Sequence, residues 1–250
     1  MSSLARMLAI LDLFSGETPS WTVEAIAQHM GYTVPTAYRY VRELCDTGLL
    51  RREGGPQVVL GPRAIELDYQ IRLADPLLNA GRDELRELAQ EAGCDVVLAT
   101  ECGGRIVTIH HEFGSEDCHP SYGRGRRMPL FRGATSKCLL AHLPRPQLRK
   151  LYQANLAEAQ ASDFSRDWDA LLAGLRDIRR QGYATTAGEL DSFLAGIAAP
   201  LLCPSRHIVA SLAFVMSRKR FGLIDVSRSV ARLQQCADAV ASRLATASPS

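Results

Sequence analysis

The fold of the N-terminal part is decided by residues 22–60, TVEAIAQHMGYTVPTAYRYVRELCDTGLLRREGGPQVVL. Apolar residues at helical spacing predict a short amphipathic helix over residues 22–30 and a second helix over residues 34–47, joined by a tight turn that begins at Gly31. Beyond it, two short apolar runs flank the turn Glu53-Gly-Gly-Pro56 and predict a hairpin. Helix, glycine turn, helix and hairpin is the order of a winged helix-turn-helix, whose second helix lies in the major groove of DNA.

The second helix has one face for a small core and one face for a partner. Thr33 is a suitable N-cap, and Pro35 falls in the first turn, where its missing N–H costs nothing. The residues expected to face the core at helical spacing are Ala37, Val41, Leu44 and Cys45, opposite Ile26, Met30 and Leu49. The residues left on the outer face are Pro35, Thr36, Tyr38, Arg39 and Arg42.

An outer face of this composition suits DNA. Arginine can donate two hydrogen bonds to guanine, which gives about 1–3 kcal/mol of discrimination, and a helix N-terminus attracts phosphate. The predicted DNA-binding residues, including two arginines where the wing begins, are Thr22, Thr33, Pro35, Thr36, Tyr38, Arg39, Arg42, Arg51 and Arg52. Which of Arg39 and Arg42 touches a base stays open, and the alternative interpretation is an ordinary solvated helix face.

The charge of the chain favours a focused contact with DNA over a broadly basic surface. The net charge of the whole chain is +2, and residues 1–76 contain seven arginines against nine acidic residues. Residues 33–63 contain five arginines against three acidic residues. DNA binding would therefore depend on a local arginine footprint, with modest non-specific affinity.

The composition is that of a globular protein with sizeable cores. The chain has 250 residues, 46% of them hydrophobic, which is enough for one large or two ordinary domains. No apolar run reaches the length of a membrane span, and no secretion signal precedes the first helix. The seven cysteines are scattered and mostly lie within apolar runs, as is typical of reduced thiols. We expect a cytoplasmic protein with no membrane partner and no cofactor.

Helical patterns lie on both sides of residues 22–60. Residues 4–14 predict a helix that ends near Gly16. Residues 62–80 predict a linker helix, with a break or kink at Pro76, and a further amphipathic helix ends at Gly93. The apolar stripe expected in the linker helix is Ala64, Ile65, Leu67, Ile71 and Leu73. The predicted domains are residues 1–61 and residues 81–250, joined by this linker.

The rest of the chain alternates strands and helices. Two apolar runs around a Cys-Gly-Gly turn predict a β-hairpin over residues 95–110. The other predicted elements are helices over residues 134–143, 167–181 and 225–245 and buried strands over residues 197–202 and 208–216. The predicted class is α+β, with a central antiparallel sheet and flanking helices.

Several short motifs also match a known family. The N-terminal ones are Leu4–Phe14, Ile26-Ala27, Gly31, Thr36-Ala37 with Arg39, and Gly48-Leu49-Leu50 ahead of Leu60-Gly61-Pro62. The C-terminal ones are Gly125–Lys137, Gly182-Tyr183-Ala184, Gly188-Glu189 and Gly196–Pro200. With these motifs in this order and at this spacing, the chain resembles the IclR-type bacterial transcription regulators over nearly its whole length.

The resemblance implies a winged helix-turn-helix domain, a linker helix and a GAF-like effector-binding domain over residues 81–250. It also implies homodimers or homotetramers on a pseudo-palindromic double-stranded DNA operator, with a small organic acid or aromatic compound as effector. The effector-binding residues that it implies are Met128, Leu130, Ala134, Ser136, Glu189, Gly196, Ala213 and Val215.

The chain departs from the family pattern at the implied pocket. Thr186 stands where an acidic or polar residue is frequent, Gly196 where some members have cysteine, and Ala213 and Val215 where others have serine. Glycine and aliphatic side chains enlarge the site and make it less polar, which favours a larger or aromatic effector over a two- or three-carbon acid. We expect the regulated genes to form a catabolic operon. Glu189 is either a ligand-binding carboxylate or a structural acceptor for backbone amides.

Two other groups of residues are candidate sites. Cys118, His119, His110, His111 and Glu112 invite a metal site, but neighbouring residues of a strand point to opposite faces and the spacing fits no standard motif. We therefore predict no metal ligands. The basic loop of residues 124–132 is open to two interpretations, an anion clamp or a solvated loop that contacts another subunit. The side chain of Lys137 is expected to form a local ion pair or cap.

The motifs of the common enzyme classes are absent. The sequence contains no nucleophile elbow, no phosphate-binding loop, no dinucleotide fingerprint and no His-Glu-x-x-His. We predict a regulator with no catalytic residues. The alternative class is a small-molecule-binding enzyme or sensor whose N-terminal helices only dimerise, and a third class is a protein–protein adaptor.

Overall fold

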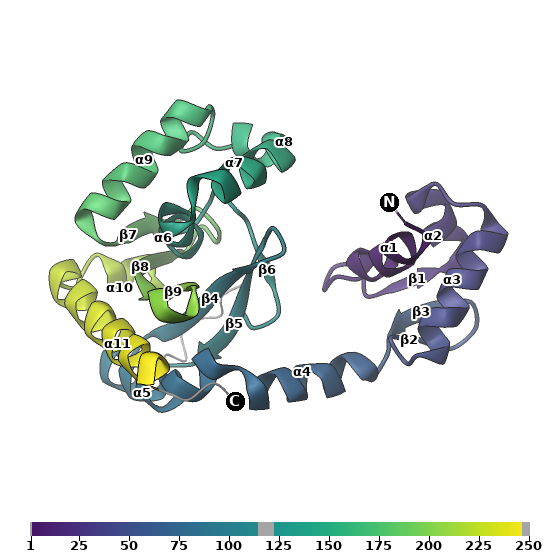
Figure 1. Cartoon of the computed structure of the whole chain (residues 1–250), viewed down its shortest axis with the longest axis horizontal. Helices are drawn as coiled ribbons and strands as arrows, with labels where there is room; N and C mark the ends of the chain where they lie inside the picture. The colour runs from purple at the N-terminus through teal and green to yellow at the C-terminus, as the bar shows by residue number, and fades with distance from the viewer. Residues whose placement is uncertain (1, 115–122, 247–250) are drawn as a thin grey trace. The chain divides into compact units, whose positions relative to one another are not determined.

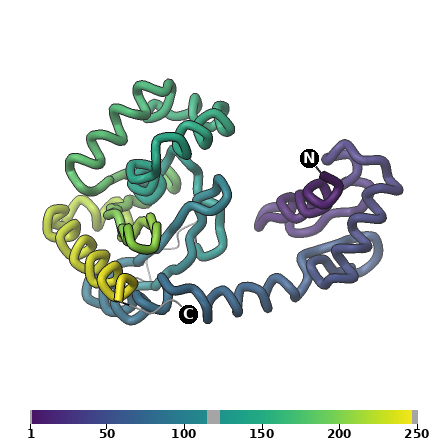
Figure 2. Tube along the Cα trace, in the orientation of Figure 1, coloured from purple at the N-terminus to yellow at the C-terminus, as the bar shows by residue number. Residues whose placement is uncertain are grey.

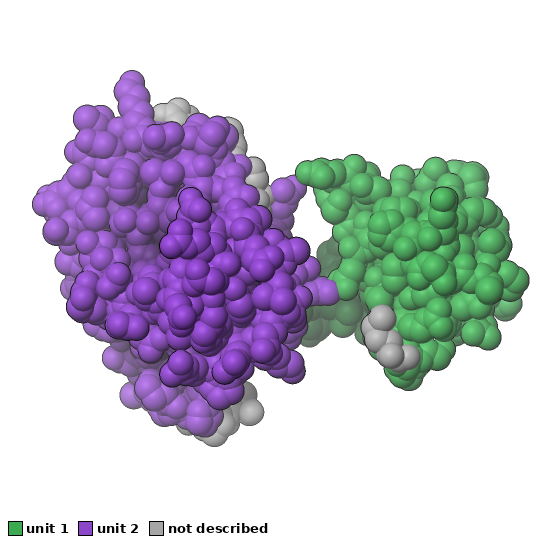
Figure 3. Space-filling view, turned by 90° about the horizontal axis from the view of Figure 1, so that it is seen from above, with its two compact units in different colours: residues 1–75 green, residues 76–250 purple. Residues whose placement is uncertain are grey.

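The structure is a computed structural model and describes residues 2–114 and 123–246. The chain divides into two compact units, Met1–Asp75 and Pro76–Ser250 (Figure 3). The trace passes from the first unit to the second once, between residues 75 and 76 (Figure 2). The first unit has one apolar core, and the second has two, on opposite faces of a sheet.

The first unit contains the predicted helix-turn-helix (Figure 1). Its elements in chain order are α1 (Ser3–Leu8), η1 (Ala9–Leu13), β1 (Ser20–Thr22), α2 (Val23–Met30), α3 (Val34–Asp46), β2 (Leu50–Arg52) and β3 (Gln57–Leu60). The hydroxyl of Thr22 accepts a hydrogen bond from Ala25 N at 3.2 Å and starts α2. Gly31, with φ +66°, ends it in the left-handed conformation that favours glycine.

The predicted wing is confirmed, with one strand added. Strands β2 and β3 pair antiparallel, and Gly54 and Gly55 between them both have positive φ angles. Strand β1 pairs with the other edge of β3, which gives the order β1-β3-β2. The sequence did not predict β1, because a strand of three residues is too short to show an alternating pattern.

The core of the first unit differs from the prediction in details. Helix α3 buries Ala37, Val41 and Leu44 as expected, and it also buries Tyr40. Cys45, which was expected to face the core, is only half-buried. The helix predicted over residues 4–14 is an α-helix followed by a tighter 3₁₀ turn, a frequent ending for an α-helix.

The predicted linker helix over residues 62–80 is two helices in the structure. Helix α4 (Arg63–Ala74) stops before Asp75, whose backbone is extended, and α5 (Pro76–Ala92) begins at the proline. Proline disfavours the helical conformation of the residue before it, so the break predicted at Pro76 is found one residue earlier. No residue of α4 is buried, and its apolar side chains are exposed.

The second unit is built on one antiparallel sheet (Figure 1). After α5 its elements are β4 (Asp95–Cys102), β5 (Arg105–Glu112), β6 (Arg127–Met128), α6 (Ala134–His142), α7 (Arg145–Ala154), α8 (Leu156–Gln160), α9 (Trp168–Gln181), β7 (Ala184–Ala187), β8 (Leu194–Cys203), η2 (Pro204–Arg206), β9 (Ile208–Ser217), α10 (Arg218–Phe221) and α11 (Val226–Thr246). The strand order is β6-β5-β4-β9-β8-β7.

Helices cover both faces of this sheet. Side chains of α5 and α11 pack with one set of alternate strand residues, such as Leu98 and Leu212. Side chains of α6, α7 and α9 pack with the other set, such as Ala99 and Ala213. The predicted α+β class, with a winged helix-turn-helix and an antiparallel sheet between helices, is confirmed. Within the described residues, no helix combines the length and apolar character needed to cross a bilayer.

Candidate functional site

The outer face of α3 is exposed and tied to the helix before it. The phenol of Tyr38 donates a hydrogen bond to Glu24 Oε1 at 2.7 Å, and this bond lowers the pKa of the Glu24 carboxyl. The hydroxyls of Thr33 and Thr36 share a hydrogen bond of 2.8 Å, so Thr33 does not cap the helix with its side chain. In the first turn of α3, Val34 and Pro35 are exposed and Thr36 is half-buried.

The arginines of this face lie in a shallow hollow with part of the wing. The hollow is lined by Tyr38, Arg39, Arg42, Glu43, Cys45, Asp46 and Arg52. Arg42 lies 3.7 Å from Asp46, and both side chains are largely exposed. The guanidinium carbon of Arg39 lies 5.4 Å from the ring centre of Tyr40. Exposed ion pairs contribute about 0–1 kcal/mol, so these contacts leave the arginines available to a partner.

The remaining predicted DNA-binding residues lie nearby in the chain but outside this hollow. Arg51 pairs with Glu53 at 2.8 Å on the exposed side of β2. Thr22 is half-buried and serves as the N-cap of α2. The structure therefore brings Tyr38, Arg39 and the wing residue Arg52 together, as the sequence predicts for a recognition helix beside a wing. Their contact with DNA stays a prediction.

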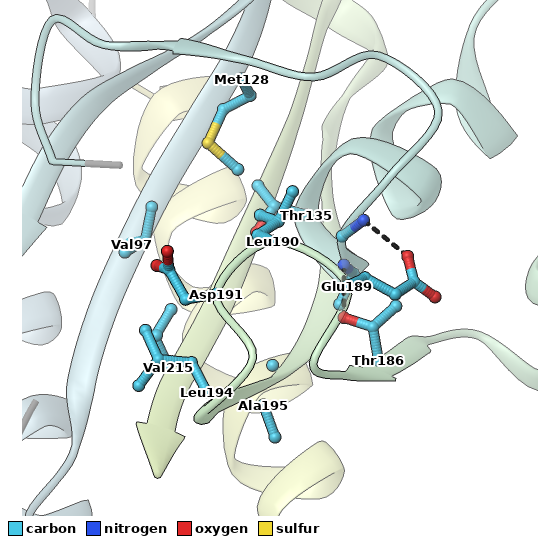
Figure 4. Close-up of a pocket in the computed structure, with 13 residues that line it drawn as sticks. Val97, Met128, Thr135, Thr186, Glu189, Leu190, Asp191, Leu194, Ala195 and Val215 are labelled. Atoms are coloured by element: carbon cyan, nitrogen blue, oxygen red, sulfur yellow. Dashed lines mark hydrogen bonds between the residues drawn. The ribbon is translucent and has the colours of Figure 1, made fainter. Parts of the chain in front are cut away.

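A second candidate site is a cavity in the second unit (Figure 4). It lies at the start of α6, beside strands β4, β8 and β9 and the loop of residues 188–193. Its lining residues are Val97, Met128, Gly133, Ala134, Thr135, Thr186, Glu189, Leu190, Asp191, Leu194, Ala195, Gly196 and Val215. The space between its lining atoms is about 490 Å³, open solvent at its mouth included.

The start of α6 is held by side chains from the far end of the sheet. Gly133 N donates to Glu189 Oε2 at 2.9 Å, and Ala134 N donates to Thr186 Oγ1 at 3.0 Å. Gly133 has φ +85°, and a Cβ there would lie 2.7 Å from Leu190 Cδ1. Glycine is thus required both by the backbone conformation and by the close approach of the loop.

Glu189 accepts a hydrogen bond from a backbone amide, which is one of the two roles expected for it, and it also lines the cavity. Lys137 Nζ lies 2.6 Å from Glu189 Oε1 and 4.5 Å from the ring centre of Phe164. Arg132 donates to the backbone carbonyl of Glu189. In Figure 4 the Glu189 carboxylate turns toward the start of α6, while Asp191 lies at the opposite side of the cavity, near Val97. Lys137 thus forms an ion pair, but its partner lies 52 residues away in the chain, so the pair is not the local one that the sequence predicts.

The implied effector residues divide into two groups. Met128, Ala134, Glu189, Gly196 and Val215 line the cavity. The other three, Leu130, Ser136 and Ala213, are fully buried elsewhere and do not line it. Their role as effector contacts has no support from the cavity.

The reasons for this division are geometric. Ala213 lies in the apolar core that includes α6, two residues before Val215 on β9. On α6, Thr135 lines the cavity and Ser136 does not. Sequence reasoning missed Val97, Leu190 and Asp191, because only the sheet register and the loop bring them to the start of α6. The one signal for Leu190 and Asp191 is the motif residue Glu189 beside them in the chain, and Val97 has no such signal.

The candidate metal region contains hydrogen bonds between histidines and carboxylates. His110 Nε2 lies 2.7 Å from Glu112 Oε1, and the buried His111 Nε2 lies 2.9 Å from Asp95 Oδ2. In the parts of the chain that the structure describes, no group of three or more potential ligands could hold a metal ion. Cys118 and His119 lie outside the described residues.

Comparison with known proteins shows the family. Residues 3–54 match the IclR helix-turn-helix domain, and residues 75–242 match the bacterial transcriptional regulator IclR C-terminal domain. The regulator KipR of Bacillus subtilis is 23% identical over 219 residues, which are 88% of this chain and 87% of that protein. The Pca regulon regulatory protein of Pseudomonas putida is 24% identical over 213 residues, 85% of this chain and 73% of that protein.

Solved structures share the fold over the whole chain. An IclR family regulator from Brucella abortus has a TM-score of 0.80 at 20% identity, covering 97% of this chain and 92% of that one. An IclR homolog from Microbacterium hydrocarbonoxydans, complexed with 4-hydroxybenzoate, has a TM-score of 0.78 at 22% identity, covering 98% of this chain and 100% of that one. With family matches across both units, the chain belongs to the IclR family of bacterial DNA-binding transcriptional regulators, and not to a class of enzymes.

Proposed function

We propose that the chain is a cytoplasmic, sequence-specific regulator of a catabolic operon that binds a pseudo-palindromic operator as a homodimer or homotetramer. A small organic acid, aromatic in the favoured case, controls its DNA binding. The proposed major-groove readers are Thr36, Tyr38, Arg39 and Arg42, and the proposed wing contacts to phosphate or the minor groove are Arg51 and Arg52.

One observation carries the DNA-binding part of this proposal. Arg39 and Arg42 of α3 line one exposed hollow with Arg52 of β2, although the first two are separated from the third by the end of the helix and a turn. A recognition helix beside a wing presents its cations in this way. The acidic balance of residues 1–76 leaves little attraction beyond this hollow, so binding depends on these few side chains.

The test is operator binding by single variants, measured by fluorescence anisotropy at several salt concentrations. Arg39→Ala is expected to lose about 1–3 kcal/mol on the operator but little on unrelated DNA if the side chain contacts a base. Arg52→Ala is expected to weaken binding to all sequences and to lower the slope of log K against log salt by about one.

Arg63→Ala is the matched control, because it removes the same charge from the first unit at a residue outside the hollow, where Arg63 pairs with Glu66. Its operator affinity should stay close to the wild-type value. If Arg39→Ala, Arg42→Ala and Arg52→Ala all bind the operator as the control does, this surface is not the DNA interface.

The effector part of the proposal is supported by the cavity and by one neighbour. Apolar side chains make up much of the lining, including Val97, Met128 and Val215, and they suit an aromatic or branched body. The N-terminus of α6, with Gly133 and Ala134 in the lining, gives the cavity an end that suits an anion. A neighbour of the same fold is complexed with 4-hydroxybenzoate.

A thermal-shift screen of organic and aromatic acids tests the effector. A ligand at a hundredfold excess over its Kd stabilises the folded state by about 2.7 kcal/mol, a readily measured rise in Tm. An acid that raises the Tm should also change operator affinity. A screen in which no acid does either would leave the DNA-binding function standing and remove organic acids as effectors.

The assembly is supported by α4. Its side chains Ile65, Leu67, Tyr69, Ile71 and Leu73 are all exposed, and a second copy of the chain would remove them from water. In a dimer, two recognition helices fit two half-sites only at a spacing of about 34–36 Å or a multiple of it. A change in how the α4 helices of the two copies place their recognition helices would therefore change operator affinity. We propose this as the route of effector control.

A further inference from the structure

The start of α6 is an anion-binding position that the chain itself occupies. The amides of Gly133 and Ala134 point to Glu189 Oε2 and Thr186 Oγ1, at 2.9 Å and 3.0 Å. Amides at a helix N-terminus, together with the helix dipole, stabilise negative charge. A carboxylate of the protein therefore lies where a carboxylate of a ligand could bind.

Lys137 completes this position and is more enclosed than its partner. Its Nζ lies 2.6 Å from Glu189 Oε1, with 11% of the Lys137 side chain and 32% of the Glu189 side chain exposed. The ring of Phe164 lies on another side of the ammonium group. If the more exposed carboxylate turned to solvent, the ammonium group would be left in a partly buried position without its counter-ion, which is unfavourable.

The other polar groups of the cavity point to a ligand with an acceptor. Thr135 is 5% exposed and lines the cavity, and its hydroxyl makes no hydrogen bond to any described residue. The Thr135 oxygen is not among the fully buried unpartnered atoms, so it is accessible from the cavity and can donate a hydrogen bond to an acceptor of a ligand there. Among the described lining residues, two are carboxylates, Glu189 and Asp191, and none is a lysine, arginine or histidine.

We propose that Glu189 is a built-in competitor of the effector. An organic acid binds by taking the place of the Glu189 carboxylate on Gly133 N and Lys137 Nζ, and the displaced side chain turns to solvent. This inference rests on the effector-binding function proposed above and adds the residue that decides which ligand charge the cavity accepts. While Glu189 is in place, an acid meets two carboxylates and an ammonium group that is already paired.

The same exchange reaches the loop of residues 188–193. Leu190 packs on Gly133, Arg132 donates to the carbonyl of Glu189, and the Glu189 carboxylate contacts Gly133 N and Lys137 Nζ, so four contacts from two neighbouring residues hold the loop to α6 and the residue before it. Replacement of the carboxylate removes two of them. Acid binding thereby changes how this loop is attached, whereas a neutral ligand leaves the attachment as it is.

The test compares acids with their own amides, which match in shape and differ in charge. Acetate, benzoate and 4-hydroxybenzoate are titrated against acetamide, benzamide and 4-hydroxybenzamide by calorimetry, into the full-length wild-type protein and into Glu189→Gln. Glutamine keeps an acceptor for Gly133 N but gives up the charge opposite Lys137. The ratio of acid affinity to amide affinity is expected to rise at least tenfold in Glu189→Gln, equivalent to about 1.4 kcal/mol.

Two further variants separate exchange from other causes. Asp191→Asn removes one negative charge from the same cavity without a contact to Lys137, so the acid-to-amide ratio should change by less than about threefold, as for a screened charge. Lys137→Gln removes the ammonium group that pairs with the Glu189 carboxylate and, after the exchange, with the carboxylate of the acid. It should lower acid affinity at least tenfold and leave amide affinity near the wild-type value.

Each remaining outcome contradicts the inference. A ratio in Glu189→Gln that stays at the wild-type value, or equals that of Asp191→Asn, means that acids bind without displacing Glu189. If Glu189→Gln lowers the affinities for acids and for amides by the same factor, Glu189 only positions the loop. Operator binding by the wild-type protein, measured without any probe, tests the regulator function separately. If neither acids nor amides bind any of the variants, the effector proposal fails together with this inference.

Discussion

Among single residues, the cysteines show how burial sets reactivity. Cys138 on α6 is fully buried, and burial raises the pKa of its thiol to about 12. Burial also raises the pKa of the Cys236 thiol, to about 11. Cys102, at the end of β4, is exposed. Only the thiolate reacts with alkylating agents, so the folded chain should distinguish these positions.

We expect iodoacetamide at pH 8 to modify Cys102 and to leave Cys138 and Cys236 unmodified in the folded protein. Peptide mapping by mass spectrometry measures each site, and the same reaction in denaturant, where all three should react, is the control. Modification of Cys138 at the rate of Cys102 would mean that α6 opens readily, in conflict with its full burial.

The thiol of Cys138 contributes to the dependence of the free energy of unfolding on pH. Its pKa is raised from 9.0 in the unfolded reference to about 12 in the folded chain. The folded state therefore retains the proton longer, and the contribution to stability is fully present below pH 9 and is lost as the pH rises toward 12. Between pH 9 and 10.5 the Tm of Cys138→Ala should fall less steeply than that of the wild type. Parallel slopes would contradict the burial effect.

At the scale of elements, glycines in positive-φ conformations define the turns. Gly31 ends α2 with φ +66°, and Gly103 turns β4 into β5 with φ +59°. A Cβ at either residue would have no atom within 4 Å, so alanine costs only the backbone conformation. That cost is about 1–2 kcal/mol for a left-handed residue. The two substitutions are a matched pair, one in each unit.

We expect Gly31→Ala to lower hydrogen-exchange protection in residues 2–60 only, and Gly103→Ala to lower it in the second unit only. The physical reason is that the two units have separate cores, so each can open locally at its own free energy. Exchange measured by mass spectrometry gives the protection of each segment. Loss of protection throughout the chain from either variant would show that the units unfold together.

For the whole molecule, the exposed apolar side chains of α4 call for a partner surface. Ile65 is 75% exposed and Ile71 is 54% exposed, and they lie on different rows of the helix. Apolar residues scattered singly on a surface are common, but five on one helix of twelve residues are a feature of interaction sites. A second copy of the chain is the partner that we propose for them.

The double variant Ile65→Lys with Ile71→Lys should lower the molecular mass in analytical ultracentrifugation toward that of one chain. It should also weaken operator binding, because one recognition helix then contacts one half-site. Leu223→Lys, at a residue that is 80% exposed in the second unit, is the control and should keep the wild-type mass. An unchanged mass in the double variant would exclude α4 as the assembly surface.

Much of the fold is determined by residues that are neighbours in the chain. The apolar spacing of α2 and α3, the glycines at 31, 54 and 55 and the break before Pro76 all act over a few residues. Their effects, which are helical periodicity, left-handed turns and steric exclusion before proline, can therefore be predicted locally. The helix-turn-helix and the wing follow from these local features, and the family follows from short motifs along nearly the whole chain.

What only the tertiary structure decided depends on residues far apart in the chain. The ion pair of Lys137 with Glu189 and the bond from Ala134 N to Thr186 Oγ1 each span 52 residues, and no periodicity encodes them. The pairing of β7 with β8 and of β8 with β9 fixes where the loop of residues 188–193 meets α6. That register is set by burying both sides of the sheet at once, so which side chains line the cavity is a property of the packed unit and not of any local stretch.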